Sequence, residues 1–167
     1  MLSVYRRLQL DLPGAPVAGV ALPSGALALL CLREGEALLA RFEVGTASDA
    51  LRRSERLLRL PSVHGSAAIL LPPTGRDHLV CVTGATVLGI DAVTMEPRWR
   101  LNLDGDGGGR AAVLPGRIVI ADPPRRLTEL DWEGHEGSSV ELDADVVALT
   151  SGPAGAVAIT AAGTVWC

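Results

Sequence analysis

One loop of the sequence has the residue types and spacing of a calcium-binding loop. Oxygen-bearing side chains occupy alternate positions at Asn102, Asp104 and Asp106, and a glycine follows where such a loop must turn sharply. Two positions that would bring further ligands hold Arg110 and Val113, which removes negative charge where a cation needs it. Two interpretations follow, a weak calcium site and a solvated turn between structural units, and the missing carboxylates favour the turn.

A second polar stretch, residues 131–139, brings together the side-chain types of a hydrolase. Asp131, His135, Ser138 and Ser139 lie close along the chain. Closeness along a chain is not triad geometry, and the G-x-S-x-G motif of a nucleophile elbow is missing from the sequence. The three histidines also lack the HxH or HExxH spacing of a metal site. We therefore interpret this stretch as a polar hairpin and assign no catalytic residue.

The charge distribution argues against a nucleic-acid partner. All 15 basic residues are arginine, which is typical of a GC-rich bacterial genome, and the net charge is −4. Arginine pairs such as Arg6-Arg7 and Arg52-Arg53 are scattered among acidic residues, whereas nucleic-acid binding needs a concentrated basic face.

The uncharged stretch 12–32 is long enough to suggest a membrane span, but its composition argues against one. Three prolines and three glycines interrupt it, and these residues break a transmembrane helix and favour turns. We therefore expect no membrane insertion. Cys31, Cys81 and Cys167 are far apart and form no CxxC pair, so neither a zinc knuckle nor a redox pair is indicated, and a reducing cytoplasm is the simplest location.

Four short strand-like segments recur along the chain and organise these loops. Each repeat has a segment that ends a unit, a small apolar strand, a turn rich in Pro and Gly, and two further strands. The unit-ending segments are 6–10, 56–60, 98–103 and 138–142, and the small apolar strands are 17–22, 66–71, 111–114 and 146–149. The two further strands are 26–32, 78–83, 117–121 and 156–160, followed by 36–44, 86–91, 126–131 and 164–167. Four strands in each unit of about 40–50 residues are typical of propeller blades.

One segment, residues 45–59, breaks this rhythm. Ser48 or Asp49 is suited to cap a short helix, and three leucines give a partial apolar stripe. The alternative interpretation, which we favour, is a longer loop between two units.

The second unit contains a recognisable motif. Asp91, Thr94 and Trp99 have the spacing of Ala-x-Asp-x-x-Thr-Gly-x-x-x-Trp, with Gly89 in place of the Ala and Met95 in place of the Gly. Residues 78–103 therefore resemble one blade of the PQQ-like, quinoprotein-type β-propeller repeat family. The resemblance implies a blade in which Asp and Thr bond the turn and the Trp fills the gap to the next blade. It does not imply the quinone cofactor, because that fold also serves as a scaffold without a prosthetic group.

These patterns predict an all-β chain, a β-propeller with about four blade-like, four-stranded antiparallel repeats at approximately 6–55, 56–97, 98–137 and 138–167. A β-sandwich is the structural alternative. Either the four units close a small ring, with segment 6–10 completing the last blade, or the chain is a partial propeller, incomplete at the C-terminus and completed by further blades. An open arc would leave sheet faces unpaired, which favours the second arrangement.

The function we expect is a non-catalytic protein-interaction scaffold within a larger bacterial protein or assembly. Propellers present loops and rims on a rigid frame, which suits binding without chemistry. The mean hydropathy of +0.30 is high for a self-contained domain, which is consistent with an apolar face covered by a protein partner or by further blades. The alternative is a propeller that binds a small ligand or calcium. Apart from that calcium candidate, we expect no cofactor.

Overall fold

The computed structural model describes residues 11–44, 51–60, 67–70, 72, 78–104, 110–122, 124–152 and 155–167. Within these residues the regular structure is entirely β-strand, arranged as four antiparallel sheets. None of the described residues belongs to a helix that could cross a membrane. The predicted all-β class and the four antiparallel units are therefore confirmed.

The sheets follow one another along the chain, and each is a meander of consecutive strands. Sheet 1 contains β1 (Ala15–Ala21), β2 (Leu27–Arg33), β3 (Glu36–Val44) and β4 (Leu51–Leu60). Sheet 2 contains β5 (Ala67–Leu70), β6 (His78–Thr83), β7 (Thr86–Asp91) and β8 (Pro97–Asn102). Sheet 3 contains β9 (Ala111–Leu114), β10 (Arg117–Asp122), β11 (Arg126–Leu130) and β12 (Glu136–Glu141). Sheet 4 contains β13 (Val146–Gly152), β14 (Gly155–Thr160) and β15 (Val165–Trp166).

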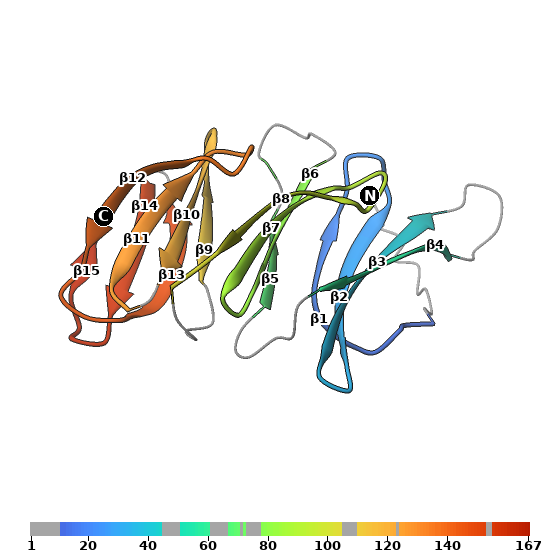
Figure 1. Cartoon of the computed structure of the whole chain (residues 1–167), viewed down its shortest axis with the longest axis horizontal. Helices are drawn as coiled ribbons and strands as arrows, with labels where there is room; N and C mark the ends of the chain where they lie inside the picture. The colour runs from blue at the N-terminus through green and yellow to red at the C-terminus, as the bar shows by residue number, and fades with distance from the viewer. Residues whose placement is uncertain are drawn as a thin grey trace, which may run out of the picture.

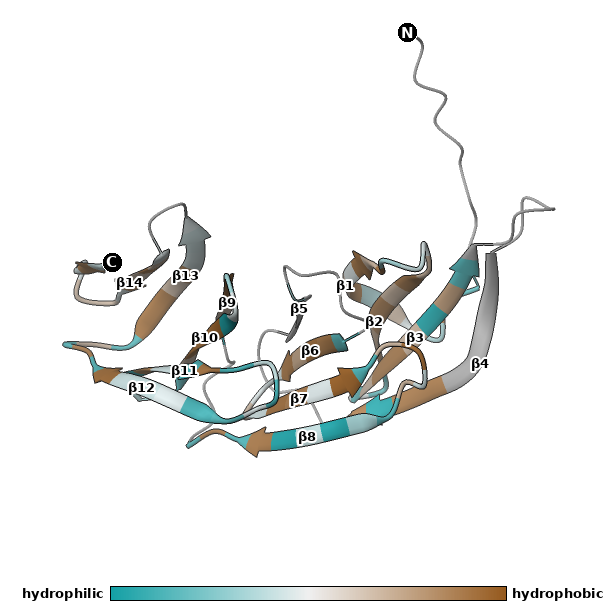
Figure 2. Ribbon diagram, turned by 90° about the horizontal axis from the view of Figure 1, so that it is seen from above, coloured by the Kyte–Doolittle hydropathy of each residue, from teal (hydrophilic) through white to brown (hydrophobic). Residues whose placement is uncertain are grey.

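The four sheets stand side by side in chain order and form an open arc (Figure 1). The first strand of each sheet lies on one side of the arc, and the last strands β4, β8 and β12 lie on the other (Figure 2). We call these the inner and outer strands. Sheets 1 and 4 occupy the two ends of the arc in both views.

Side-chain alternation along the central strands explains why the sheets stack face to face. Successive residues of a strand point to opposite faces, so one strand can serve two neighbouring sheets. In β6, Leu79 and Cys81 join the core between sheets 1 and 2, whereas Val80 and Val82 join the core between sheets 2 and 3. The buried, β-branched and aliphatic character of these strands follows from burial on both faces.

The segments predicted to end a unit coincide with the outer strands of their sheets. Residues 56–60 lie in β4, and 98–103 and 138–142 overlap β8 and β12. Segment 6–10 lies outside the described residues. Each sheet in the structure therefore begins with an inner strand and ends with an outer strand. The predicted repeats, counted from Arg6, begin instead with the outer-strand segment, so their boundaries are shifted by one strand.

Both interpretations of residues 45–59, the short helix and the favoured longer loop, are wrong for the part of that segment the structure describes. Residues 51–59 belong to β4, which pairs antiparallel with β3 from Val44↔Leu51 to Ala37↔Leu60. The open edge of the nine-residue strand β3 offers backbone partners along its whole length. Pairing those groups outweighs the weak helical stripe of three leucines. Residues 45–50 lie outside the described residues.

Candidate functional site

The turn between β7 and β8 is organised by the carboxylate of Asp91. Its Oδ1 accepts hydrogen bonds from the amide of Val93 at 2.9 Å and from the amide of Thr94 at 2.8 Å. The backbone closes the same turn, because the amide of Met95 donates to the carbonyl of Asp91 at 2.7 Å. The guanidinium of Arg98 pairs with the other carboxylate oxygen. Asp91 and Thr94 of the sequence motif therefore meet within one turn.

Met95 adopts the left-handed conformation at the position where the propeller motif has glycine. Its φ is +58°, which strains a side chain that has a Cβ by about 1–2 kcal/mol. The side chain is buried in the core between sheets 1 and 2, and burying a methionine contributes a comparable amount. Burial thus offsets the strain at this position.

Trp99, the third motif residue, points from β8 towards sheet 3. Its indole Nε1 donates a hydrogen bond to the carbonyl of Trp132 at 3.0 Å. A Cβ added to Gly89 would lie 2.1 Å from the indole, and one added to Gly134 would lie 2.5 Å from it. Trp99 therefore occupies space left by two glycines, one on its own sheet and one in the β11–β12 turn of the next sheet.

The polar hairpin 131–139 repeats the Asp-centred turn in sheet 3. The Oδ1 of Asp131 accepts hydrogen bonds from the amides of Glu133 at 2.9 Å and His135 at 2.8 Å, and His135 Nδ1 lies 2.8 Å from Oδ2. Burial opposes ionisation of Asp131, but the bonds from His135 and Glu133 outweigh it and lower the pKa of the carboxyl. Ser138 and Ser139 lie further along, on β12. Asp131 and His135 thus act within their own turn.

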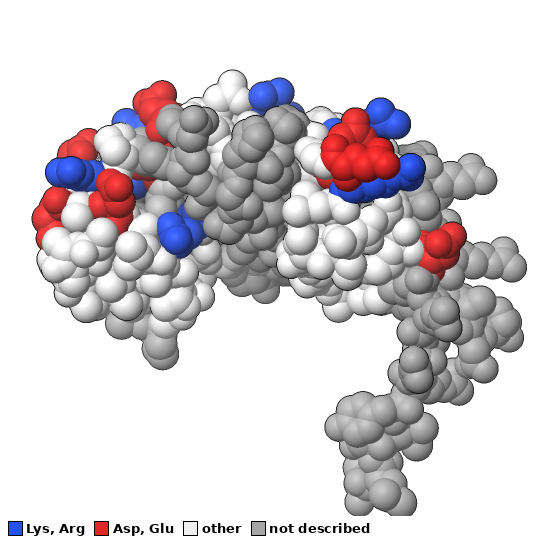
Figure 3. Space-filling model, turned by 90° about the horizontal axis from the view of Figure 1, so that it is seen from below, with Lys and Arg blue, Asp and Glu red and all other residues white. Residues whose placement is uncertain are grey.

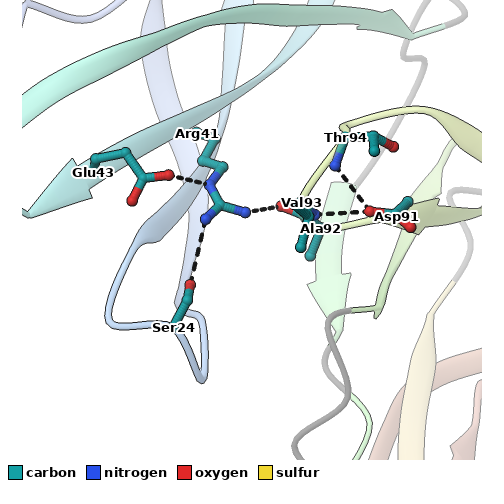
Figure 4. Close-up of polar contacts among 7 residues, drawn as sticks. All are labelled: Ser24, Arg41, Glu43, Asp91, Ala92, Val93 and Thr94. Carbon is teal, nitrogen blue, oxygen red and sulfur yellow. Dashed lines mark hydrogen bonds and ion pairs between the residues drawn. The ribbon is translucent and has the colours of Figure 1, made fainter.

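Arg41 is a structural residue that sequence reasoning missed. It lies on β3 with its side chain buried, and its Nη1 donates to the carbonyl of Ala92 in the Asp91 turn of the next sheet (Figure 4). Its Nε donates to Glu43 at 2.7 Å, and its Nη2 lies 3.5 Å from Ser24 Oγ. The sequence signal was an arginine among apolar residues on a central strand, where a charge needs partners. Arg41 therefore ties sheet 1 to sheet 2.

In the described part of the calcium candidate loop, the side-chain oxygens of Asn102 and Asp104 lie near arginine side chains. Asn102 Oδ1 accepts a hydrogen bond from Arg100 Nε at 2.9 Å, and Asp104 Oδ2 lies 3.7 Å from Arg126 Nη2. Asp106 lies outside the described residues. Among the residues that the structure does describe, no group of three or more His, Cys, Asp or Glu could hold a metal ion. Arg126 bonds directly to Asp122 and reaches the exposed Asp104 carboxylate only at ion-pair distance.

This geometry predicts that calcium does not stabilise the protein. We expect the melting temperature in millimolar calcium and in chelator to agree within about 1 °C, because a ligand raises stability only if it binds the folded state. Differential scanning calorimetry of the chain and of Asp104→Ala measures this directly. A calcium-dependent rise of several degrees that Asp104→Ala abolishes would restore the calcium interpretation.

The bonds to Asp91 predict a loss of stability in acid. Burial raises the pKa of the carboxyl, but the amide of Thr94, the guanidinium of Arg98 and the amide of Val93 outweigh it and bring the pKa to about 2, from an ordinary 3.8. Because the folded pKa is depressed, the stabilisation is complete above the unfolded value and disappears as the pH falls from about 4 towards 2.

We therefore expect Asp91→Ala to lower the free energy of unfolding by about 1–2 kcal/mol at pH 7, as loss of a capping side chain does elsewhere. The difference from the parent chain should shrink as the pH falls below 4. Urea unfolding at pH 7, 4 and 2.5 measures it, and a difference that is unchanged at pH 2.5 would show that the charge of Asp91 is irrelevant.

Among the three cysteines, two are buried and one is exposed. Cys31 and Cys81 belong to the apolar interior, and Cys167 is exposed at the end of β15. Burial raises the pKa of the Cys81 thiol to about 12, so it stays protonated and packs as a small apolar side chain.

A cavity of about 420 Å³ lies between sheets 3 and 4. Its wall includes Val119 from β10, the Arg117–Glu129 ion pair at 2.8 Å, and Ala156 and Trp166 from sheet 4. Ser138 and Ser139 line it from β12. This junction is packed less completely than the two preceding ones, each of which encloses a buried apolar cluster.

The opposite face of sheet 4 is apolar and exposed, and we call it the end face. It contains Ala148, Ile159 and Val165, which are cross-strand partners and therefore share a face. Ala156 and Trp166 occupy the other face, against sheet 3. Figure 3 shows that the end of the molecule carrying sheet 4 is largely uncharged below a band of mixed acidic and basic side chains. Sequence patterning alone did not distinguish this sheet from the others.

The fold can be compared with solved structures, whereas no protein-family model and no curated protein sequence matches the chain. BamB from Moraxella catarrhalis is 17% identical, with a TM-score of 0.65, over 91% of this chain and 41% of BamB. The Pan2 WD40 domain of Neurospora crassa is 13% identical, with a TM-score of 0.64, over 88% of this chain and 44% of that one. The computationally designed Ika4 protein is 14% identical, with a TM-score of 0.67, over 98% of this chain and 97% of Ika4.

The chain thus has a β-propeller fold, and its four sheets are propeller blades. It spans less than half the length of BamB and of the Pan2 domain chain. At these identities the likeness concerns the fold alone.

Proposed function

We propose that this protein is a non-catalytic interaction scaffold, a set of propeller blades that binds another protein through the end face of sheet 4. The all-arginine composition supports a bacterial source, and three cysteines without a CxxC pair support a cytoplasmic location. The Asp91, Thr94 and Trp99 motif supports a place among PQQ-like blades. We do not propose a quinone-binding site on the basis of that resemblance.

One comparison within the molecule carries the proposal. In each sheet the second and third strands form a hairpin, and the same position of that hairpin can be compared between sheets. The second cross-strand pair from its turn is Val82–Val87 in sheet 2, Ala121–Leu127 in sheet 3 and Ile159–Val165 in sheet 4. Their first members are 0%, 8% and 40% exposed. Val82 packs in the core shared with sheet 3, and Ala121 is buried on β10, whereas Ile159 has no following sheet within the described chain.

Uncovered aliphatic side chains at a position that is otherwise buried indicate a binding surface. Burying apolar area contributes about 25 cal/mol per Å², which favours a protein surface over solvent at the end face. The polar side chains also argue for a non-catalytic function. The polar side chains with catalytic potential, Asp91, Asp131 and His135, are held within their own turns.

Site-specific photo-crosslinking tests the proposal. A benzophenone amino acid replaces Val165 of the full chain, and the matched control replaces Val93, which is similarly exposed on the β7–β8 turn of sheet 2. In bacterial cells producing the chain, we expect a discrete crosslinked protein from position 165 and none from position 93. Crosslinks from neither position, or equally from both, would contradict binding through the end face.

A further inference from the structure

The outer strand of sheet 3 is an open sheet edge. All four strands of this sheet are described, and β12 is the last of them, paired with β11 on its inner side. Every residue of β12 is exposed. A strand in this position presents a row of backbone amides and carbonyls that favour pairing with a further strand.

The pairing of β11 with β12 shows which backbone groups face the open edge. The amide of Leu142 donates to the carbonyl of Arg125 at 2.7 Å, so the backbone at Leu142 bonds inward. Along an antiparallel pair, hydrogen-bonded and non-hydrogen-bonded positions alternate, and the register from Glu141 to Ser139 is regular. The amides and carbonyls of Ser139 and Glu141 therefore point outward.

The outer strand of the preceding sheet carries residues that oppose strand addition, and β12 lacks them. β8 begins with Pro97, which has no amide, and also contains Arg98 and Arg100. Proline and charged side chains on an edge are means by which proteins prevent pairing with another chain. Residues 137–140, at the centre of β12, include neither. Of these two edges, β12 is therefore the one suited to accept a strand.

The segment around β12 is strongly acidic. Residues 129–145 contain seven Asp and Glu and no Arg or Lys, in a chain whose net charge is −4. Glu136 and Glu141 lie at the two ends of β12 and share one face of the sheet, because their cross-strand partners are Leu130 and Arg126. Arg126 is itself paired with Asp122. The open edge thus has negative charge at both ends.

These charges favour a basic strand over a second copy of β12. Antiparallel pairing of two β12 strands over their full length brings Glu136 of one next to Glu141 of the other, and like charges at opposite positions destabilise a pair. Basic side chains at those positions stabilise it instead. Val140 is 44% exposed and lies on the opposite face of β12, where an aliphatic side chain of an added strand can contact it. The edge therefore fits an extended chain in which basic and aliphatic residues alternate.

We propose that β12 binds an extended, basic segment of a partner protein, which joins sheet 3 as a fifth strand. Backbone hydrogen bonds at Ser139 and Glu141 pair the two strands, and the carboxylates of Glu136 and Glu141 select a basic chain. This surface lies on the outer side of the arc (Figure 2) and is a second binding surface, separate from the end face of sheet 4.

Direct binding of a synthetic peptide to the full chain tests the proposal. The probe is a fluorescein-labelled hexapeptide of alternating arginine and valine, and fluorescence polarisation measures its binding. The control peptide has the same sequence with every amide N-methylated, which keeps the charges but removes the backbone donors. We expect the control to bind at least about 10-fold more weakly, because it cannot form the hydrogen bonds of a strand pair.

Protein variants separate strand pairing from charge attraction. Ser139→Pro removes an outward amide, a change that edge strands tolerate, and should weaken binding of the unmodified peptide about 10-fold. Glu136→Gln combined with Glu141→Gln should weaken it about 5-fold, the effect of two exposed charge pairs. Glu34→Gln combined with Glu96→Gln is the matched control, because it removes two exposed charges outside sheet 3 and should leave binding unchanged.

Equal binding of the two peptides, or equal weakening by the two pairs of Glu→Gln substitutions, would overturn the proposal, because either result means charge attraction without strand pairing. Failure of the unmodified peptide to bind at concentrations up to about 1 mM would overturn it as well. So would a parent chain that dimerises without peptide and becomes monomeric with Ser139→Pro, because the edge would then hold a second copy. Crosslinking from Val165 tests the end face independently of these results.

Discussion

Replacing Gly89 by alanine is expected to lower the free energy of unfolding by about 3 kcal/mol, the upper range for overpacking a tight interior. The added Cβ would lie 2.1 Å from the Trp99 indole, a distance that real Cβ atoms do not adopt. The indole cannot withdraw freely, because Gly134 of the next sheet confines its other side and Trp132 accepts its N–H hydrogen bond. Urea unfolding followed by circular dichroism measures the loss.

A double-mutant cycle isolates this contact from other effects of the substitution. In a Trp99→Leu background the indole is gone, so adding Gly89→Ala should cost less than about 1 kcal/mol. Gly137→Ala is the matched control, because its Cβ would lie 3.6 Å from the nearest atom, in ordinary contact. Equal costs for Gly89→Ala in both backgrounds would show that Trp99 does not fill the gap between sheets 2 and 3.

Arg41→Met is expected to lower the free energy of unfolding by about 2–3 kcal/mol. The substitution keeps an apolar side chain of similar length but leaves the carbonyl of Ala92 without its donor, and an unsatisfied buried acceptor costs about 1–3 kcal/mol. Glu43 also loses its partner. The effect should fall on the contact between sheets 1 and 2, visible as faster hydrogen exchange in β7.

Arg59→Met is the matched control for that experiment. Arg59 is 76% exposed and lies 3.7 Å from Glu36, so the pair is a surface ion pair. Such pairs contribute about 0–1 kcal/mol, and we expect a change near the lower limit. A comparable loss from both arginines would mean that Arg41 acts only as one of many surface charges.

Strand positions were predictable because two strong local signals agree along most of the chain. Short apolar runs bounded by Pro and Gly mark the strands, and their fourfold recurrence orders them. The segments expected at 78–83, 111–114 and 117–121 lie within strands β6, β9 and β10 of the structure. The exception was β4, where the polar run from Arg52 to Arg56 lacks the apolar alternation that marks the other strands.

The contacts between sheets were not predictable to the same degree. The Trp99 motif indicated a filled gap, but the role of Gly89 depends on the indole that approaches it in three dimensions. Arg41 contacts Ala92, which lies 51 residues further along the chain, and local sequence patterns do not predict contacts at that separation. The exposure of Ile159 likewise depends on the absence of a following sheet in the described chain, because its segment reads like the buried strands before it.

The most direct test of this account is the photo-crosslinking comparison between Val165 on the end face of sheet 4 and Val93 on the β7–β8 turn. The account predicts a discrete crosslinked protein from position 165 and none from position 93, because the end face exposes aliphatic side chains at positions that are buried in sheets 2 and 3. Crosslinks from neither position, or equally from both, would contradict binding through the end face.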